Sequence, residues 1–339
     1  MSGIRATLSD APTKFCDVGI EVDDDGVGMT RRSWALFAAM CVIWGIPYLL
    51  IRVAVRDIEP GTLVFLRTAI GGLILLPIAF RTGGFKPVLS RWFPLLAFAV
   101  IEMAIPWLLL SDAERKVSSS LSGLLIAAVP LIGVLVARLT RSDERASRLQ
   151  LGGLLIGLVG VSMLVGLDFG DVHLSALLEI LVVVIGYATA PVIMARRLAD
   201  LPSVPVVCAS LLVVAAGYLP AAIAQWPHHV TGEAVWSVAL LGVICTALAF
   251  VIFFALISAI GPARATVITY VNPAIAVLFG VTLLGESFTL GMAVGFPLIL
   301  VGSVLGARKS EPAVAGPEAA VAETTVGAVA PEPEPGLAV

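Results

Sequence analysis

Ten long apolar runs dominate this sequence and limit what it can fold into. A helix needs about 20 predominantly apolar residues to cross the hydrocarbon core of a bilayer, and stretches of that kind recur along most of the chain. They lie near 33–54, 61–80, 92–111, 118–137, 150–167, 175–195, 204–224, 235–258, 263–283 and 289–307. The connectors between them are short and leave no room for a soluble domain. Because the runs lack a period of two, they are predicted to be helices rather than the strands of a barrel.

The composition agrees with a membrane protein. Of the 339 residues, 59% are hydrophobic and 13% are charged, whereas soluble domains are close to half apolar and a quarter charged. The polar, acidic stretch 1–32 lacks the apolar core of a signal peptide. The stretch 308–339 is rich in Pro, Glu, Ala and Val. Both ends are therefore predicted to be disordered tails.

Lys and Arg are distributed unevenly between the two sides of the predicted bundle. With the N-terminus in the cytoplasm, sixteen of them fall in cytoplasmic connectors and tails, and three, Arg56, Arg115 and Lys116, fall outside. Basic residues concentrate on the cytoplasmic side of membrane proteins. The sequence therefore predicts a multi-pass protein of the cell membrane with both termini in the cytoplasm.

The chain also repeats itself. A proline, a glutamate and two glycines recur in one order: Pro130, Glu144, Gly153 and Gly160, then Pro273, Glu286, Gly295 and Gly302. In both copies the glycines follow the glutamate after nine and sixteen residues. The match places spans 4–5 on spans 9–10, so the unit is five helices, and an odd unit inserts its two copies in opposite senses. The predicted fold is an all-α membrane protein with ten transmembrane helices in two inverted five-helix repeats, 33–167 and 175–307.

These features resemble the ten-helix EamA type of the drug/metabolite transporter (DMT) superfamily. The resemblance rests on "WGIPYLLIRVAV" with Trp44 and Gly45, on Arg67 in "VFLRTAIGGLILL", and on the doubled Pro–Glu–Gly–Gly pattern, and it covers 33–307. The first copy departs from the family pattern by reading "TRSDE" where the second reads "LGE", and span 6 reads "IGYA" rather than "WG".

The resemblance implies a secondary carrier that works by alternating access. Such proteins are commonly exporters of amino acids, related metabolites or drugs, often driven by the proton gradient. The expected partners are a small-molecule substrate, protons and the lipid bilayer, with no nucleic acid and no cofactor, in a monomer or homodimer. The sequence names neither the substrate nor the direction of transport.

Glu102 is the one charge in the apolar run "FAVIEMAIPWLLL". A charge at mid-membrane costs about 2.5–3.5 kcal/mol on insertion scales, so it needs a partner or a hydrated cavity. Arg67 in span 2 lies at nearly the same predicted depth and is a candidate partner. For Arg67 we favour a static ion pair that locks two helices. For Glu102 we favour a place in the central cavity, in proton coupling or substrate contact.

Aromatic residues are the next candidates. Trp44 and Tyr48 are four residues apart in span 1 and are predicted to share a face, either on the cavity wall or in the core. Tyr187 in span 6 lies close to the position where the repeat would place a counterpart of Trp44, and the same two interpretations, cavity wall or core, apply to it. Trp107 near the end of span 3 is assigned to an interfacial aromatic belt.

Pro130 and Pro273 each remove one helical hydrogen bond, which frees the carbonyls of Ile126 and Thr269 for a cavity or leaves only a packing kink. The polar cluster Thr269, Tyr270 and Asn272 favours the cavity around Pro273.

Three further sets of residues are assigned structural roles. Glu144 and Glu286 are expected to lie at the positive ends of spans 5 and 10. The pairs Gly153–Gly157 and Gly291–Gly295 permit close helix approach, inside the monomer more readily than in a dimer. Arg52 and Glu179 are treated as interfacial anchors.

Two other functions were compatible with a multi-pass chain. An intramembrane enzyme needs a nucleophile with a base, or a metal cluster, at membrane depth. The histidines, His173, His228 and His229, lie in polar connectors, and the four cysteines show no metal-binding spacing. No enzyme activity and no metal site are therefore predicted. A channel or a non-transporting receptor is the alternative to a carrier, although no polar filter is evident.

Overall fold

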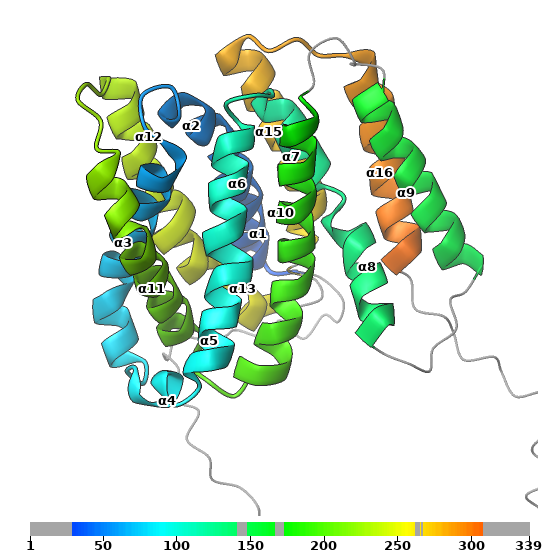
Figure 1. The fold of residues 1–339 in the computed structure, drawn as a ribbon. Coiled ribbons are helices and arrows are strands. Elements are labelled where there is room, and N and C mark those ends of the chain that lie inside the picture. The colour runs from blue at the N-terminus through cyan, green and yellow to red at the C-terminus, as the bar shows by residue number, and fades with distance from the viewer. Residues whose placement is uncertain (1–28, 141–147, 167–172, 262–264, 266, 308–339) are drawn as a thin grey trace, which may run out of the picture.

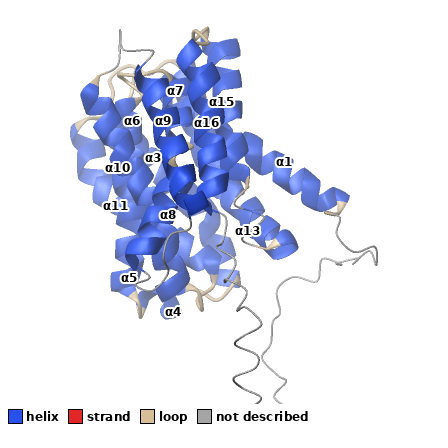
Figure 2. Ribbon diagram, turned by 90° about the vertical axis from the view of Figure 1, so that its right-hand side faces the viewer, coloured by secondary structure: helices blue, strands red, loops and turns tan. Residues whose placement is uncertain are grey.

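The computed structural model describes residues 29–140, 148–166, 173–261, 265 and 267–307. Every regular element in these ranges is a helix, and Figure 2 shows them gathered into one bundle. In chain order they are α1 (Arg31–Gly45), α2 (Pro47–Ala54), α3 (Pro60–Arg81), α4 (Lys86–Leu89), α5 (Trp92–Ala99), η1 (Val100–Ala104), α6 (Ile105–Ala113), α7 (Ser119–Ile126), α8 (Val129–Thr140), α9 (Arg148–Gly166), α10 (Leu174–Ile193), η2 (Met194–Leu198), α11 (Ser203–Ala224), α12 (Gly232–Gly242), η3 (Val243–Leu248), α13 (Ala249–Ile260), α15 (Ile268–Leu284) and α16 (Leu290–Ala307). The label η denotes a π-helical turn.

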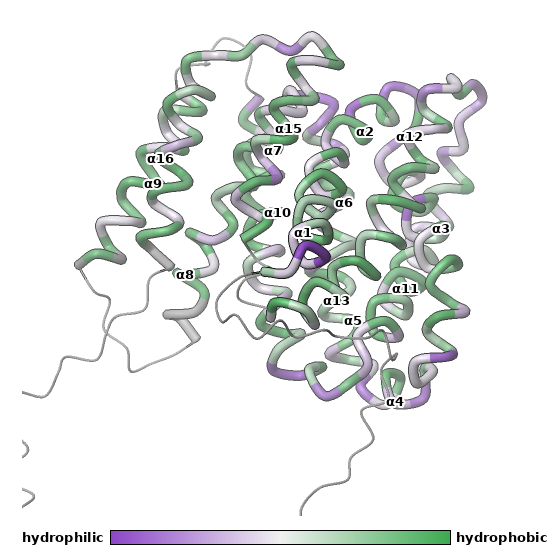
Figure 3. The backbone as a smooth tube through the Cα atoms, turned by 180° about the vertical axis from the view of Figure 1, so that it is seen from behind, coloured by the Kyte–Doolittle hydropathy of each residue, from purple (hydrophilic) through white to green (hydrophobic). Residues whose placement is uncertain are grey.

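Seven stretches are long and apolar enough to cross a membrane. They are Arg31–Ala54, Pro60–Arg81, Trp92–Ala113, Ser119–Val136, Leu174–Leu198, Ser203–Ala224 and Gly232–Ile260. Three shorter apolar helices, Leu151–Val165, Ile268–Leu284 and Leu290–Leu305, lie where spans 5, 9 and 10 are predicted. Figure 3 shows hydrophobic residues along the bundle and hydrophilic ones gathered at its two ends. The all-α membrane class is confirmed, while the count of ten spans and their inversion stay predictions.

Prolines interrupt some of these spans. Pro47 begins α2 and separates it from α1, because proline cannot supply the N–H that a helix interior needs. Span 4 breaks between α7 and α8, and Pro130 is the second residue of α8. Pro273, its predicted counterpart, is buried inside the continuous helix α15. The two repeat prolines therefore differ in their effect on the backbone.

The packing relates the two halves of the chain. Span 2 packs on span 7 (α3 on α11), span 5 on span 10 (α9 on α16) and span 4 on span 9 (α7 on α15). Figure 1 shows α9 and α16 together at one side of the bundle. Span 1 packs on span 8 and span 9, and span 6 packs on span 3 and span 4. Exchanging each span for the one five places along the chain leaves this pattern unchanged.

Two aspartates connect the halves at opposite ends of the bundle. Asp57, three residues before α3, accepts hydrogen bonds from the backbone N–H (2.8 Å) and hydroxyl (2.5 Å) of Thr231, the N-cap of α12. Asp200, three residues before α11, forms a bidentate pair with Arg91, the N-cap residue of α5, at 2.6 Å for both contacts. Figure 1 shows the connector that follows α2 at the top and α4 at the bottom.

Glycines bring α9 and α16 into close contact. A Cβ atom on Gly160 would lie 2.8 Å from the carbonyl oxygen of Gly295, and one on Gly295 would lie 2.7 Å from that of Gly160. Gly302 faces Gly153 and Gly157 in the same interface. Small residues let helix backbones approach this closely. These glycines therefore pack within one chain.

Candidate functional site

Glu102 lies in the π-helical turn of span 3. The N–H of Ile105 bonds the carbonyl of Val100, five residues back, and Pro106 follows with no N–H to offer the carbonyl of Glu102. Turns of this type are often found at functional sites. The hydroxyl of Tyr218 donates to the carbonyl of Ala104 at 2.9 Å and supports the turn from α11. The carboxyl of Glu102 is half-buried, and its Oε2 has no hydrogen-bond partner among the described residues.

The predicted ion pair between Glu102 and Arg67 does not form. Among the described residues, no carboxylate oxygen of Glu102 lies within 4.0 Å of the Arg67 guanidinium. The depths were estimated from a regular α-helical rise, whereas a π turn adds a residue and rotates the side chains that precede it. Glu102 therefore faces α10, where Tyr187 lies within electrostatic range of it.

Arg67 contacts two other spans instead. Its Nε donates to Thr246 Oγ1 at 2.9 Å, and its guanidinium carbon lies 3.7 Å from the ring centroid of Trp107. Its side chain is only 7% exposed, and Trp107 is 6% exposed. The assignment of Trp107 to an interfacial belt is therefore wrong, because the ring is buried under a cation, where the ring quadrupole attracts the positive charge.

Thr246 lies in the π turn of span 8, η3. Its hydroxyl donates to the carbonyl of Leu241, five residues back, at 2.8 Å while accepting from Arg67. Gly71 lets α3 approach this turn, since a Cβ atom there would lie 2.6 Å from Thr246 Cγ2. Spans 2, 3 and 8 thus meet at one buried polar point.

The remaining aromatic candidates divide between two regions. Tyr48 is buried and, like the half-buried Tyr187, lies within electrostatic range of Arg67. Gly186, the residue before Tyr187, has no room for a Cβ atom, which would lie 2.6 Å from the carbonyl oxygen of Ile101 in η1. Trp44 packs elsewhere, with its ring centroid 4.6 Å from that of Phe253. Trp44 and Tyr48 lie in separate hydrophobic clusters, because Pro47 separates their helices.

Asn272 lies at a helix contact. It is 8% exposed, and with its amide nitrogen facing the two carbonyls it donates to Ile268 at 3.0 Å and to Cys41 of α1 at 3.1 Å. Thr269 and Tyr270, one turn earlier on α15, are half-buried. Asn272 therefore connects α15 to α1. The cavity role of Thr269 and Tyr270 stays a prediction.

Glu286 forms the densest hydrogen-bonded site at the predicted outer end. Its Oε1 accepts from the N–H (2.8 Å) and hydroxyl (2.9 Å) of Ser119, and its Oε2 accepts from the N–H (2.9 Å) and hydroxyl (2.5 Å) of Ser120. Glu286 does lie at the N-terminus of a helix, as expected, but this helix is not the one that was predicted. Glu286 caps α7, across the interface between spans 4 and 9, rather than the following helix α16. Its predicted counterpart Glu144 lies outside the described residues.

Glu114 lies next to this cap and is fully buried. Neither of its carboxyl oxygens has a hydrogen-bond partner among the described residues, although Ser122 faces it. Burial raises the pKa of Glu114 well above its usual range, and the charge of Glu286 raises it further, while Arg52 and Ser122 act in the opposite sense.

The two predicted interfacial anchors contact this same end of the bundle. Arg52 donates from Nη1 to the carbonyl of Glu114. Glu179 pairs with Lys116, which also pairs with Asp112. Arg52 and Glu179 therefore connect α2 and α10 to the end of span 3.

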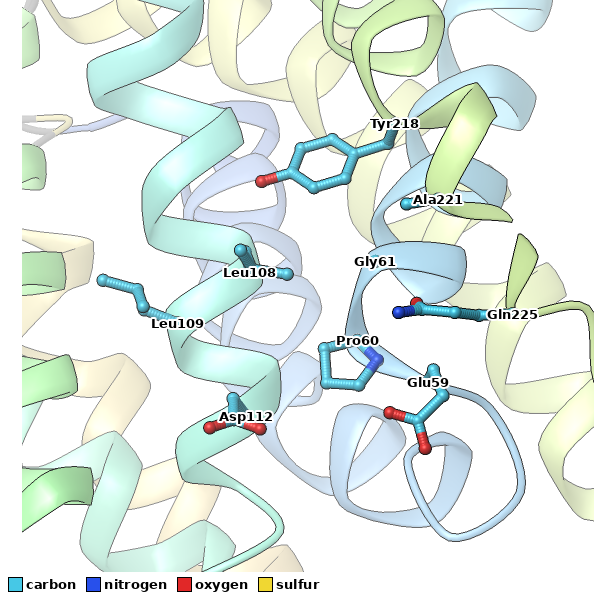
Figure 4. A pocket seen from close by; sticks show the side chains of 9 residues that line it. All are labelled: Glu59, Pro60, Gly61, Leu108, Leu109, Asp112, Tyr218, Ala221 and Gln225. Carbon is cyan, nitrogen blue, oxygen red and sulfur yellow. The ribbon is translucent and has the colours of Figure 1, made fainter. Parts of the chain in front are cut away.

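A cavity of about 390 Å³ opens between α3, α6 and α11 at the same end. Figure 4 shows Leu108, Leu109 and Asp112 on one wall, and Ala221 and Gln225 on the other. Two residues that line the cavity take part in ion pairs, Glu59 with Arg115 at 2.7 Å and Asp112 with Lys116. None of the residues singled out from the sequence lines this cavity.

A family comparison matches both halves of the chain. The model of the EamA-like transporter family matches residues 32–166 and again 174–307. The chain belongs to the EamA-like transporter family. As the sequence predicts, it is a membrane transporter of the DMT type.

Relatives of this EamA-like transporter are found in bacteria and archaea. The uncharacterized inner membrane transporter YedA of Escherichia coli strain K12 is 30% identical over 266 residues, which is 75% of this chain and 83% of YedA. The uncharacterized transporter YdfC of Bacillus subtilis is 25% identical and covers 78% of this chain and 87% of its own. An uncharacterized transporter of Archaeoglobus fulgidus is 22% identical over 82% of this chain and 99% of its own. A solved crystal structure shares the fold, with a TM-score of 0.60 and 21% identity over 81% of this chain and 96% of that one.

Glu114, Thr246, Ser119 and Ser120 of this EamA-like transporter were not predicted to be site residues. Glu114 lies in the connector "SDAERK" among other charges, where an exposed side chain is the ordinary expectation. Thr246 was hidden in an apolar run, although a hydroxyl there is a polar group at membrane depth. Within the described ranges, no three His, Cys, Asp or Glu side chains are arranged to hold a metal ion.

Proposed function

We propose that this EamA-like transporter is a secondary active carrier that exports small metabolites, amino acids or drugs by alternating access. It consists of two inverted five-helix repeats, 33–167 and 175–307, with both termini cytoplasmic in the cell membrane. The observation that carries the proposal is that the contacts of span 2 with 7, 5 with 10, 4 with 9, 1 with 8 and 9, and 6 with 3 and 4 are unchanged when the two halves are exchanged. Span 4 also contacts span 10, and this contact has no equally extensive counterpart among the described helices. A fold that can pack the same way with its halves swapped has two related states, which is what alternating access needs.

The bends in the spans support a central substrate site. Spans 3 and 8 both contain a π turn, and these turns begin at Val100 and Val243. Each presents polar side chains at mid-span, Glu102 from one and Thr246 from the other. Irregular backbone at membrane depth is tolerated where it is buried in protein or lines a cavity. The substrate path of this proposal runs between these turns, past Tyr48, Tyr187 and Arg67.

Glu102 is the residue in this proposal that contacts substrate or carries a coupled proton. Its unpartnered oxygen is costly to maintain in a purely structural residue, because a buried acceptor without a donor loses its hydration. Neutral Gln has nearly the same shape, so Glu102→Gln removes the charge and the proton while keeping the packing.

The substrate is to be identified first, by comparing metabolites in medium and cytosol with the gene overexpressed and deleted. Transport of that compound is then measured for Glu102→Gln beside protein level and thermal stability. We expect normal folding and a loss of transport of about tenfold or more, which corresponds to roughly 1.4 kcal/mol. Glu233→Gln, in the exposed first turn of α12, is the matched control and should transport normally. A Glu102→Gln protein with the wild-type rate and pH dependence would reduce Glu102 to a packing residue.

A further inference from the structure

Glu114 and Glu286 form a carboxyl pair that the central site does not use. Glu114 ends span 3, and Glu286 lies in the connector between α15 and α16. The charge of Glu286 acts on Glu114, and both residues lie at the end of the bundle where Glu286 connects α15 to α7. The exposure of the two carboxyl groups to water therefore depends on whether α7 and α15 are in contact at this end.

The charges around Glu114 come from each element that faces it. Arg52 approaches from α2, Glu286 from the connector after α15, and Ser122 from α7. Tyr48 of α2 lies within electrostatic range. On its own connector, Arg115 is paired with Glu59, and Lys116 is paired with Asp112 and Glu179. Arg52 is thus the one cation among the described residues that acts on the Glu114 carboxyl and has no carboxylate hydrogen-bond partner of its own. Arg52, Glu114 and Glu286 together carry one positive and two negative charges, which a single proton makes neutral.

The hydrogen bonds show which carboxyl group holds that proton. Glu286 accepts four hydrogen bonds, two at each carboxyl oxygen and two of them from backbone N–H groups at the start of α7, so both of its oxygens act as acceptors. Glu114 is fully buried and accepts none among the described residues. A buried acid without donors is far more stable neutral than charged. The proton therefore belongs on Glu114.

We propose that Glu114 is a proton-binding site that fills when the outer end of the transporter closes, with Glu286 as the charged cap that completes the closure. This inference rests on the alternating-access function proposed above. When α7 and α15 separate at this end, water reaches Glu114, its proton passes to that water, and the carboxylate is hydrated. On closure one proton is taken up again from the outer side.

The direction of the pH effect follows from this step. The closed state binds one proton more than the open state, so acid outside favours closure and alkali outside favours opening. Between the two pKa values of Glu114, the ratio of closed to open molecules changes about tenfold per pH unit.

The proton on Glu114 is tested directly by infrared spectroscopy of the purified full-length protein across pH. A protonated carboxyl gives a C=O stretching band that a carboxylate lacks. We expect such a band at neutral pH, lost in Glu114→Gln and kept in Glu286→Gln and in the exposed control Glu233→Gln. Glu114→Gln mimics the protonated acid and should fold. If it does not, Glu114→Asp should retain a band at a changed frequency. A band at neutral pH that is unchanged in both Glu114 variants would overturn the proposal.

Closure is tested with the variant Ala276→Cys, in a chain whose native cysteines are replaced. Ala276 lies one turn deeper on α15 than Gly280, where a Cβ atom would meet Ser120 and Glu286, and it is 1% exposed. An impermeant thiol reagent is added from outside at different external pH values. We expect faster labelling as external pH rises, slow labelling at every pH with Glu114→Gln, and fast labelling at every pH with Glu286→Ala. Glu233→Gln should follow the parent.

The outcomes separate this proposal from the function on which it rests. If Glu286→Ala leaves labelling slow, the interface between α7 and α15 does not open, and alternating access at this end is wrong. If Glu286→Ala speeds labelling but Glu114→Gln keeps the pH response, the outer end opens and only the proton site is wrong.

Discussion

Spans 2 and 3 of this transporter share backbone features with spans 7 and 8 and differ from them in the side chains that they carry. Helices α3 and α11 both contain 22 residues, and the π turns η1 and η3 lie at matching places in spans 3 and 8. Yet the third residue of η1 is Glu102 and that of η3 is Cys245. The eighth residue of α3 is Arg67 and that of α11 is Ser210.

The difference separates features that occur in both halves from features that occur in one half alone. The shared bends and aspartate contacts concern the backbone and its ends, and they can support two related conformations. The charged residues at mid-membrane occur in the first half alone among the described spans, so in the proposed function the substrate or proton meets the two halves unequally. The shared features are expected to control folding and topology, and the features found in one half alone are expected to control transport.

The largest effect is expected from a test of the inversion itself. A topology reporter fused at Gly285, between α15 and α16, should read outside the cell, and one fused at position 142, between spans 4 and 5, should read inside. The reason is that an odd five-helix unit places corresponding connectors on opposite sides. The same reading at both positions would end the inverted-repeat interpretation.

The next largest effect is expected at Arg67, and Ser210, at the equivalent position of α11, serves for comparison. Arg67→Ala should reduce transport by about tenfold or more, because it removes a cation–π contact and the hydrogen bond to Thr246, worth roughly 1–3 kcal/mol together. Ser210→Ala should transport normally, since its hydroxyl bonds only the carbonyl of Val206 within its own helix. Transport of the identified substrate is measured in proteoliposomes at equal protein. Equal losses in the two variants would mean that the second half also lines the site.

The fold class was predictable because it depends on the length and hydrophobicity of the apolar runs, and neither quantity depends on how a helix is rotated about its axis. Likewise the Pro–Glu–Gly–Gly pattern found the glycines of the contact between α9 and α16. What failed depended on rotation about the helix axis. Glu102 and Arg67 were placed together by depth alone, and the π turn at Val100–Ala104, which sequence periodicity does not reveal, turned them towards different spans.

Long-range partners were the other limit. Glu286 was correctly expected at a helix N-terminus, but the nearest helix along the chain was the wrong one, because Ser119 and Ser120 approach it only in the folded bundle. Glu114 was not recognised for the same reason: burial of a connector residue follows from what packs over it. The sequence pattern indicated which residues to compare between the halves, and packing decided which of them meet.

A smaller effect, on stability, is expected in the interface between α9 and α16. Gly160→Ala should destabilise the protein by about 1–3 kcal/mol, because the new methyl group would meet the backbone of α16. Gly152→Ala, on the same helix but with open space around its Cβ position, is the matched control and should be neutral or slightly stabilising. Thermal unfolding in detergent measures both. A change in oligomeric state rather than in unfolding temperature for Gly160→Ala would instead place this surface in a dimer.

The smallest effects are expected at the two aspartates that connect the halves. Asp200→Asn removes one partner of an exposed ion pair with Arg91, so the loss of unfolding free energy should be about 0.2–1 kcal/mol and should shrink at high salt.

Asp57→Asn removes a carboxylate that holds the N-cap of α12, and its effect on stability should depend on pH. Hydrogen bonds from the Thr231 side chain and backbone lower the pKa of Asp57 below its usual value. A lowered pKa means that this contribution is present above the ordinary pKa of an aspartate and is lost as pH falls through the folded-state value. The wild type and Asp57→Asn should therefore differ in unfolding temperature at neutral pH and converge in acid.

Because the two contacts lie at opposite ends of the bundle, the double variant of Asp57→Asn and Asp200→Asn should lose the sum of the two single losses in unfolding free energy. A double variant that loses much more than this sum would show that the two ends are coupled through the bundle, and the comparison of the halves would then have to treat the two contacts as one unit.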